Sequence, residues 1–503
     1  MARIAVIGAG MGAMAAAARL AVAGHRVAVY ERTETYGGAV RRFERDGFAF
    51  DTGPGLLSVP AVYRDLFVKT GREPLEECVE LVQVDPSSRH VFADGTQVSL
   101  PNASRAGVVS ALDQALGGDA GQRWGDFLVR AREAWDRTRR PLLEEPLWSD
   151  WSVLAEREPY PAVPHKRLLR TRRAGTLAEV GAWELRDPRL TALLESHALA
   201  YGLDPRDTPA SAAVLPYMEH AFGTWYVRGG MRELARAVYE RCVARRVEFV
   251  FGAEVRRILE KDGRAAGVEL ADGSVAEADH VVAGVGPDRL SSMTGHQLYE
   301  AGDVRPQRMD GYQPGRFTVL LALRGQREPG AVHRTIVHAP DRTAELDFLR
   351  ERTEEPARPT VTVLRPDDPA LRPDEEHESV VLSAVLPAGI EWDVEDTEER
   401  FADLLVGAAE TAVAGLRERL LWRETHTPDD TDDETDSGVG GLPAPALAAG
   451  RGRFLRPANA TALPGLYRVG GWSHPGGGLP HTGMSGALVA GLIVEGPDFR
   501  GSQ

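Results

Sequence analysis

The chain begins with an apolar run, a cluster of glycines and an alanine-rich stretch, and this order restricts its fold more than any other feature. Residues 3–7 (RIAVI) are rich in β-branched side chains and predict a buried strand, whereas residues 13–23 predict a helix. Gly8, Gly10 and Ala13 fit the pattern G-x-G-x-x-G/A. The first glycine permits a tight turn, the second lets the backbone approach a pyrophosphate, and the small third residue allows close packing of helix on strand. The N-terminus therefore predicts a strand–turn–helix unit whose helix begins at a phosphate-binding site.

A second strand with an acidic end extends this unit. Residues 26–30 (RVAVY) predict the strand, and Glu31 follows it about 20 residues after the glycines. A carboxylate at this place accepts hydrogen bonds from a ribose 2′-hydroxyl and repels a 2′-phosphate, which favours FAD or NAD over NADP. The alternative is a βαβ unit of the same shape that binds no nucleotide.

The next stretch resembles the phytoene-desaturase family of flavoproteins. Residues 31–57 (ERTETYGGAVRRFERDGFAFDTGPGLL) carry the matching positions Gly37, Gly38, Phe50, Asp51, Thr52, Gly53 and Pro54. The resemblance implies that the cofactor is FAD, bound along its whole length. One position departs from the family, because relatives usually have arginine after the Gly-Gly pair and this chain has Ala39. Arg41 or Arg42 could reach the same space, or both could be solvated surface residues.

A second match to the same family lies near the end of the chain, in residues 454–493. The loop HPGGGLPHTGMSG (474–486) leads into a small-residue helix, so we expect its glycines to lay backbone against the flavin and the helix N-terminus to stabilise the charge of the reduced ring. His474 matches a family histidine, whereas His481 replaces a glycine or apolar residue. His481 is either an acid–base candidate or a structural hydrogen-bonding group. The two histidines lack further nearby ligands, so we predict no metal site.

The glycine motif, the resemblance and the departure at His481 together give two sets of candidate site residues. The cofactor set is Gly8, Gly10, Met11, Gly12, Ala13, Glu31, Arg32, Gly37, Gly38, Ala39, Gly53, Pro54, Val255, Gly470, Gly471, Leu479, Pro480 and Thr482. The catalytic candidates are His481, His474, Tyr226 and Arg228. The last two belong to the aromatic-rich segment 222–238, which by resemblance borders the flavin and the substrate. Arg228 could instead anchor a surface loop.

The length of 503 residues exceeds what one ordinary core supports. We expect an α/β fold in which a discontinuous Rossmann-like FAD-binding domain alternates with a mixed α/β substrate domain. Residues 1–75, 225–290 and 435–503 are expected to form the FAD-binding domain. Residues 76–224 and 291–434 are expected to form the substrate domain.

The expected substrate domain contains strand, helix and loop signals. Residues 87–100 predict a hairpin about an Asp-Gly turn, and residues 317–323 and 379–386 predict strands of a mixed sheet that roofs the flavin. Residues 350–378 are predicted to be loop, and residues 426–437, with six carboxylates, a solvated acidic loop. A helical pattern between these segments predicts one buried face, which packs in the core or lines a lipid tunnel, at Trp124, Phe127, Leu128, Ala131, Ala134 and Trp135.

The overall charge and the cysteine content restrict the partners and the compartment. The formal net charge of −15 argues against nucleic acid as a partner. Cys78 and Cys242 give no disulfide framework, which favours a reducing cytoplasm. The apolar N-terminal stretch imitates a signal peptide, but Arg19 interrupts it.

One segment is basic despite the acidic composition. Residues 159–178 contain no acidic side chain and five basic ones, Lys166, Arg167, Arg170, Arg172 and Arg173. The segment could rest on an anionic membrane surface, here the inner face of the cytoplasmic membrane. It could equally be a solvated positive face or form internal ion pairs.

These features predict an FAD-dependent dehydrogenase that introduces double bonds into an apolar, polyene-like substrate by hydride transfer to flavin. Isomerisation, saturation, or a bacterial secondary metabolite as substrate are alternatives within the same family. An amine oxidase would share the N-terminal motif and could use Trp472 as an aromatic wall, but the HPGGGLP loop disfavours it. An alternative that is not an enzyme is a noncatalytic flavoprotein that binds a pigment or a lipid.

Overall fold

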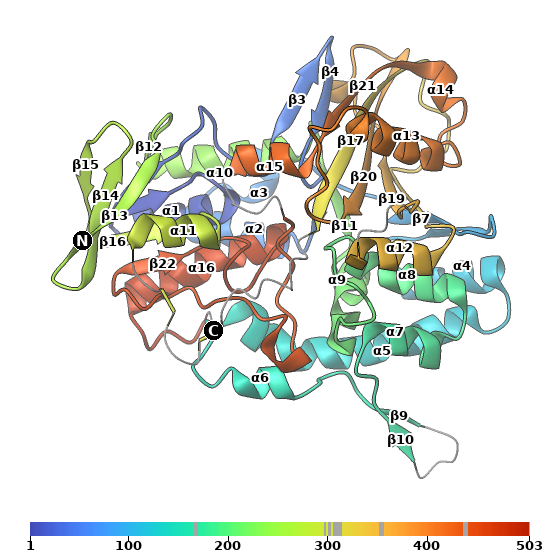
Figure 1. Ribbon diagram of the computed structural model, residues 1–503, viewed down its shortest axis with the longest axis horizontal. Coiled ribbons are helices and arrows are strands. Elements are labelled where there is room, and N and C mark those ends of the chain that lie inside the picture. Colours follow the sequence, from blue (N-terminus) through green and yellow to red (C-terminus); the bar gives the residue numbers. More distant parts are fainter. Residues whose placement is uncertain are drawn as a thin grey trace.

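The N-terminal strand becomes the middle of a five-stranded parallel sheet in the computed structural model (Figure 1). The structure describes residues 1–164, 170–295, 298–299, 303–304, 314–351, 357–435 and 441–501. In spatial order the strands of the sheet are β12 (Glu248–Val250), β2 (Arg26–Tyr30), β1 (Arg3–Ile7), β16 (His280–Ala283) and β22 (Leu466–Arg468). Strands from three distant parts of the chain therefore share one sheet.

The two faces of this sheet are covered by different layers because side chains alternate along each strand. Ile4 and Val6 face a core formed with helices α1 (Met11–Val22), α2 (Ala61–Thr70), α10 (Met231–Ala244) and α16 (Leu479–Glu495). Ala5 and Ile7 face a core formed with α11 (Pro287–Thr294) and the antiparallel strands β13 (Val255–Lys261), β14 (Arg264–Leu270) and β15 (Val275–Glu277). This arrangement confirms the predicted α/β class and the Rossmann-like sheet.

Helices α1 and α16 cross at small residues. A Cβ atom on Gly486 would lie 2.5 Å from the carbonyl oxygen of Gly12 and 2.8 Å from the Cβ atom of Ala15. These distances are shorter than van der Waals contact, so only glycine allows the two helices to approach this closely.

A seven-stranded sheet forms the second main layer of the molecule. Its spatial order is β21 (Leu420–His426), β17 (Gly315–Arg324), β20 (His377–Leu386), β19 (Val361–Leu364), β18 (Arg334–Val337), β7 (Ser88–Val91) and β8 (Gln97–Leu100). Only β18 and β7 pair in parallel within it. The predicted hairpin at 87–100 and the predicted strands at 317–323 and 379–386 are confirmed. Helix α13 (Thr397–Ala409) packs on the face formed by Phe317, Val319 and Leu321.

Two predicted loops contain regular structure instead. Residues 361–364 form β19, which fills the gap between β20 and β18. The acidic segment forms helix α15 (Pro428–Thr435), whose first turn is closed by hydrogen bonds between Thr427 and Asp430. The loop predictions were wrong because pairing with neighbouring strands and local capping outweigh composition.

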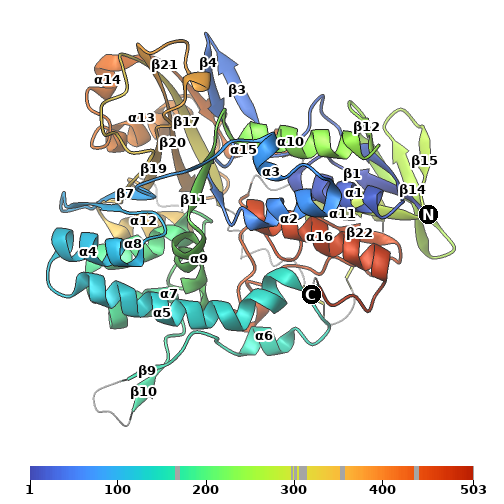
Figure 2. The ribbon, with the colours of Figure 1, turned by 180° about the vertical axis from the view of Figure 1, so that it is seen from behind.

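Helices pack beneath the seven-stranded sheet (Figures 1 and 2). The main ones are α4 (Arg105–Leu116), α5 (Ala120–Arg139), α8 (Pro188–Leu199), α9 (Val214–Phe222) and α12 (Arg342–Glu351). All the aromatic and alanine positions predicted on one face of α5 are buried in a core with α8 and α9, so they pack in the core rather than line a tunnel. The remaining short elements are α3 (Leu75–Cys78), α6 (Ser152–Glu156), α7 (Leu177–Val180), α14 (Leu416–Arg419), β3 (Arg42–Arg45), β4 (Phe48–Asp51), β5 (Leu57–Ser58), β6 (Leu81–Gln83) and β11 (Thr224–Val227).

The basic segment includes a hairpin that projects from the helical layer in both views (Figures 1 and 2). Its strands are β9 (Val163–Pro164) and β10 (Thr171–Arg172). Arg170 is exposed, whereas Arg172 lies over the ring of Trp183 at 4.2 Å. Lys166 and Arg167 lie outside the described residues.

The close crossing of α1 and α16 can be tested with one methyl group. We expect Gly486→Ala to lower the free energy of unfolding by about 1–3 kcal/mol, because the added Cβ overpacks the crossing. The measurement is the melting temperature of the purified protein. Gly125→Ala in α5 is the matched control, because its Cβ would meet only a side-chain methyl of Val109 at 3.4 Å. Equal melting temperatures for the two variants would contradict the prediction.

Candidate active site

A cavity of about 560 Å³ is lined by residues of both main sheets and their helices. Every residue that we predict to contact the cofactor lines this cavity, from Gly8 and Glu31 to Val255 and Thr482. Among the catalytic candidates, His481 also lines it, whereas His474, Tyr226 and Arg228 do not. The fold thus brings together segments that are far apart in the sequence.

One end of the cavity fits a pyrophosphate. Helix α1 starts there at Met11, and its N-terminus has no side-chain cap and no acidic residue in the first turn. Gly10 has φ −71°, which any residue adopts, and a Cβ atom on it would meet nothing within 4 Å. The protein itself therefore gives no reason for glycine at this position, whereas an anion seated on the helix N-terminus does.

The neighbouring wall fits a ribose and a base. Both carboxylate oxygens of Glu31 accept backbone hydrogen bonds, one from Ala9 at 2.7 Å and one from Thr33 at 2.8 Å. These bonds orient the carboxylate, which still has lone pairs for a hydroxyl donor. Arg289, at the start of α11, also lines this wall and pairs with Glu254 at 2.7 Å. Arg289 is not among the predicted cofactor residues, because no sequence motif includes it.

Arg41 and Arg42, which follow the alanine that stands where relatives have arginine, form hydrogen bonds with other residues of the protein. Arg41 donates to the carbonyl oxygens of Gly38 at 3.0 Å and Glu434 at 2.9 Å, and it does not line the cavity. Arg42 donates to the carbonyl oxygen of Gly229 at 3.3 Å. Neither residue is a freely solvated surface arginine, and neither lines the cavity.

The family run at 50–54 has a structural role. The buried carboxylate of Asp51 accepts from the backbone N–H of Met231 at 2.7 Å, so it caps helix α10. Burial raises the pKa of Asp51 to about 6. A Cβ atom on Gly53 would lie 2.0 Å from the carbonyl oxygen of Ala39. Residues 51 and 53 therefore contact two glycine turns. Asp51 bonds to the residue after Gly230, and Gly53 packs against the residue after Gly38.

The glycines of the C-terminal loop divide into two groups. Cβ atoms on Gly476 and Gly477 would lie 2.6 Å from the carbonyl oxygen of Ala444 and 1.7 Å from that of Pro443. Tight packing within the protein requires these two glycines, in contrast to the expectation that they approach the flavin. Gly470 and Gly478 line the cavity and have positive φ values of 103° and 93°.

The two histidines of this loop have different surroundings. His474 is fully buried, and its Nε2–H donates to the carbonyl oxygen of Glu145 at 2.9 Å, so it holds the loop in place. His481 lines the cavity, and its Nδ1 has no hydrogen-bond partner among the described residues. Burial lowers the pKa of each imidazole to about 4. Both imidazoles are therefore neutral at physiological pH.

Tyr226 and Arg228 anchor a loop away from the cavity. The hydroxyl of Tyr226 donates to Asp368 at 2.8 Å, and the same carboxylate accepts from the N–H of Gly229 at 2.6 Å. Arg228 pairs with Glu80 at 2.9 Å on the surface. Neither Tyr226 nor Arg228 lines the cavity, and the polar group of each is bonded to another residue of the protein.

The part of the cavity beneath the seven-stranded sheet, here called its second half, is more polar than we predict from the sequence. Arg316, Tyr201 and the ion pair between Glu219 and Arg334 line it, together with Thr318, Thr362 and Ser383. A signal for two of these residues was present in the sequence. In residues 315–324 Arg316 and Thr318 alternate with Phe317 and Val319, which places the polar pair on the opposite face of the strand.

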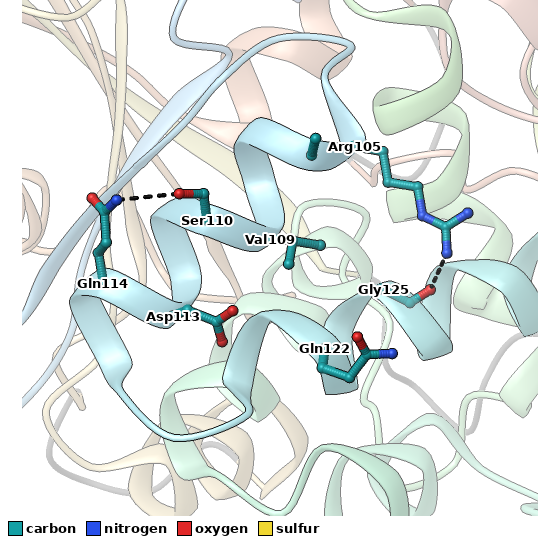
Figure 3. A pocket seen from close by; sticks show the side chains of 8 residues that line it. Arg105, Val109, Ser110, Asp113, Gln114, Gln122 and Gly125 are labelled. Atoms are coloured by element: carbon teal, nitrogen blue, oxygen red, sulfur yellow. Dashed lines mark hydrogen bonds between the residues drawn. The ribbon is translucent and has the colours of Figure 1, made fainter.

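A second hollow lies on the outside, between α4 and α5 (Figure 3). Its polar groups bond within the protein. Gln114 donates to the hydroxyl of Ser110 at 3.1 Å, and Arg105 contacts the carbonyl oxygen of Gly125 at 3.5 Å. Asp113 accepts from the N–H of Gly121 at 2.8 Å. This hollow therefore offers no convergent unpaired groups to a ligand. Among the described residues, there is no cluster of potential metal ligands.

The parallel sheet, its glycine-rich turn and the adjoining cavity fit the class of flavin-dependent oxidoreductases. Residues 14–314 match the family described as flavin containing amine oxidoreductase, and the chain belongs to this family. FAD is therefore its cofactor.

Similar proteins extend over nearly the whole chain. The 4,4'-diapolycopene oxygenase of Methylomonas sp is 29% identical over 98% of each chain. The zeta-carotene-forming phytoene desaturase of Myxococcus xanthus is 29% identical over 99% of this chain and 95% of that protein. An oxidoreductase from Methanosarcina mazei has a similar structure, with a TM-score of 0.65 at 18% identity, covering 97% of this chain and 99% of that one. The resemblance to the phytoene-desaturase family is confirmed.

The open space beside Gly10 leads to a cofactor-binding prediction. We expect Gly10→Ala to leave the melting temperature of the cofactor-free protein unchanged, because its Cβ meets no protein atom. It should weaken FAD binding by about 1–3 kcal/mol, roughly fivefold to 150-fold, because the methyl group would occupy the space expected for the phosphates. The measurement is FAD titration of the cofactor-free protein, with Gly125→Ala as the control. Unchanged FAD affinity would show that the phosphates do not pass this turn.

Proposed function

We propose that this protein is a dehydrogenase that introduces double bonds into a polyene-like substrate with a long apolar body. The observation that carries this proposal is the continuity of the cavity. One cavity joins the glycine-rich turn at Gly10 to the space beneath the seven-stranded sheet. The start of α16 contacts both parts, since Thr482 lies against Gly12 and Gly478 lies against Tyr201. The names of the carotenoid-modifying relatives support a polyene rather than an amine as the substrate.

The chain would contribute positioning, exclusion of water and a proton acceptor. When bound, oxidised flavin supplies a hydride acceptor. Helix α16 points an uncapped N-terminus at the cavity, and this positive end favours negative charge there. His481, in the first turn of α16, has a neutral imidazole with a free Nδ1, so it is able to accept a proton. We propose it as the base.

We also propose the domain division on which this function rests. Residues 1–75, 225–290 and 435–503 would form the FAD-binding part, since they contain the five strands of the parallel sheet. Residues 76–224 and 291–434 would form the substrate part, since they contain the seven-stranded sheet and most of the helical layer.

Anaerobic reduction tests the proposed reaction. We expect the absorbance of the bound flavin to bleach when a partly saturated polyene is added without oxygen. The bleaching rate should be constant from pH 8 to pH 5, because the imidazole of His481 stays neutral down to about pH 4. Bleaching by primary amines instead would support an amine oxidase, and unchanged absorbance with every bound polyene would support a noncatalytic binding protein.

The role of His481 is tested in the same assay. His481→Gln should slow bleaching by about 10²-fold or more, the usual contribution of a proton acceptor, with unchanged FAD content. His474→Gln is the matched control, because His474 does not line the cavity and its loss should lower stability first. An unchanged rate in His481→Gln would leave this histidine a structural role only.

We further propose that the projecting hairpin touches anionic membrane. Two of the basic residues contact the protein itself, because Arg172 packs on Trp183 and Arg173 donates to the carbonyl oxygen of Glu158 at 2.6 Å. Arg170 is the described basic residue that stays free for lipid headgroups. Within the described residues, no helix has the length and apolar character to cross a bilayer.

Vesicle binding tests this surface. Arg170→Gln should weaken binding to phosphatidylserine vesicles about fivefold, the effect of removing one basic residue worth about 1 kcal/mol. Arg256→Gln, at an exposed position on β13, is the control. Equal binding by both variants would contradict membrane contact through the hairpin.

A further inference from the structure

Arg316 is a cation in the cavity without an anionic partner among the described residues. It lies near the start of β17, lines the cavity and is partly buried. Its only protein hydrogen bond among the described residues is a long one, from Nη2 to the carbonyl oxygen of Ala200 at 3.4 Å. Burial lowers the pKa of Arg316, because the charged form loses water without gaining a carboxylate.

The carboxylates of this half of the cavity are already used. Glu219 forms a two-pronged ion pair with Arg334. Glu345 accepts from the backbone N–H of Thr360 at 2.5 Å and from its hydroxyl at 3.1 Å. Burial raises the pKa of Glu345 to about 7, and the charge of Glu219 is neutralised by Arg334. Neither carboxylate pairs with Arg316, so the charge of Arg316 is available to a ligand.

A second free polar group stands beside Arg316. Tyr201 lines the cavity, its hydroxyl forms no hydrogen bond with the described residues, and the charge of Arg316 lies close enough to counteract the rise that burial causes in the pKa of Tyr201. It lies 3.3 Å from the position of a Cβ atom on Gly478, and Nδ1 of His481 lies 3.6 Å from the same point. Tyr201 therefore connects Arg316 to the start of α16.

Hydroxyl groups continue this polar surface across the roof of the cavity. Thr318 lies two residues after Arg316 on the same face of β17. Thr318 is paired with Ser383 of β20, which is paired with Thr362 of β19. All three line the cavity, and the hydroxyl of Thr318 has no partner among the described residues. A pure hydrocarbon filling this space would remove water from these groups without replacing its hydrogen bonds.

We propose that Arg316, assisted by Tyr201, binds an anionic oxygen group of the substrate, so that the substrate is a polyene carboxylic acid rather than a hydrocarbon. A guanidinium binds a carboxylate through two parallel hydrogen bonds, and burial strengthens them. The inference rests on the proposed function in one respect only, namely the polyene character of the substrate. It adds the end group that the cavity selects.

The test compares two probes that differ in charge alone. Retinoic acid, a polyene carboxylic acid, and its methyl ester are bound to the FAD-loaded protein in equilibrium dialysis without oxygen. We expect the acid to bind about tenfold to hundredfold more tightly than the ester, the range for a charge-assisted hydrogen bond. Equal binding of acid and ester would overturn the inference.

Variants locate the preference at Arg316. Arg316→Met should weaken binding of the acid by the same factor and leave the ester unchanged, whereas Arg316→Lys should retain part of the preference. Arg324→Met is the matched control, because Arg324 lies on the same strand, is exposed and donates to the carbonyl oxygen of Glu418. Should Arg316→Met fail to fold, Tyr201→Phe and Arg316→Lys must each reduce the preference. An unreduced preference in both would overturn the inference.

Two further outcomes separate this inference from the proposed function and from a role toward the cofactor. Preferential binding of the acid without any flavin bleaching by polyenes would support Arg316 and contradict the dehydrogenase. Bleaching by a partly saturated polyene acid and by its methyl ester with equal KM would support the dehydrogenase and contradict the role of Arg316. A shifted flavin absorbance in Arg316→Met with an unchanged acid preference would assign Arg316 to the flavin and overturn the inference.

Discussion

The site depends on the close contact between the first and last helices of the chain. Gly486 in α16 approaches the backbone of α1 at Gly12, and a Cβ atom on Gly12 would lie 2.9 Å from the carbonyl oxygen of Thr482. Because both helices start at the cavity, this crossing sets where their N-termini point. Both helix ends are without a side-chain cap, and both line the cavity. Small residues are required because any larger side chain would separate the two ends.

Burial determines the charge state of the groups in the cavity. His481, which lines the cavity, is kept neutral with a pKa near 4, because an imidazolium in this interior would lose its water. Arg316 stays charged in the same kind of environment because a guanidinium has a much higher intrinsic pKa. The cavity therefore combines a neutral imidazole with a cation that lacks a described anionic partner. This combination suits a substrate whose reacting part is apolar and whose end is charged.

The cofactor half of the cavity was predictable because it depends on backbone. Gly8, Gly10 and the pair at Gly37 and Gly38 are recognised by type and spacing, and all line the cavity. The substrate half was not predictable in the same way. Tyr226 appeared functional from its place beside a glycine pair, yet its hydroxyl bonds to Asp368, more than a hundred residues later. The partner of a polar side chain is a tertiary property, and a single sequence does not state it.

The sequence by itself determined the parallel sheet and its glycine-rich turn, because local hydrophobic period and glycine spacing encode them. It indicated FAD through the resemblance of residues 31–57 and 454–493 to the phytoene-desaturase family. Tertiary structure decided which polar residues remain unpaired. The long-range strand pairing of β17 with β20 places Arg316 and Thr318 on the roof of the cavity, and the ion pair of Glu219 with Arg334 leaves Arg316 without a carboxylate. The substrate end group that we propose depends on Arg316, which is left unpaired among the described residues because Glu219 and Glu345 have partners elsewhere in the folded chain.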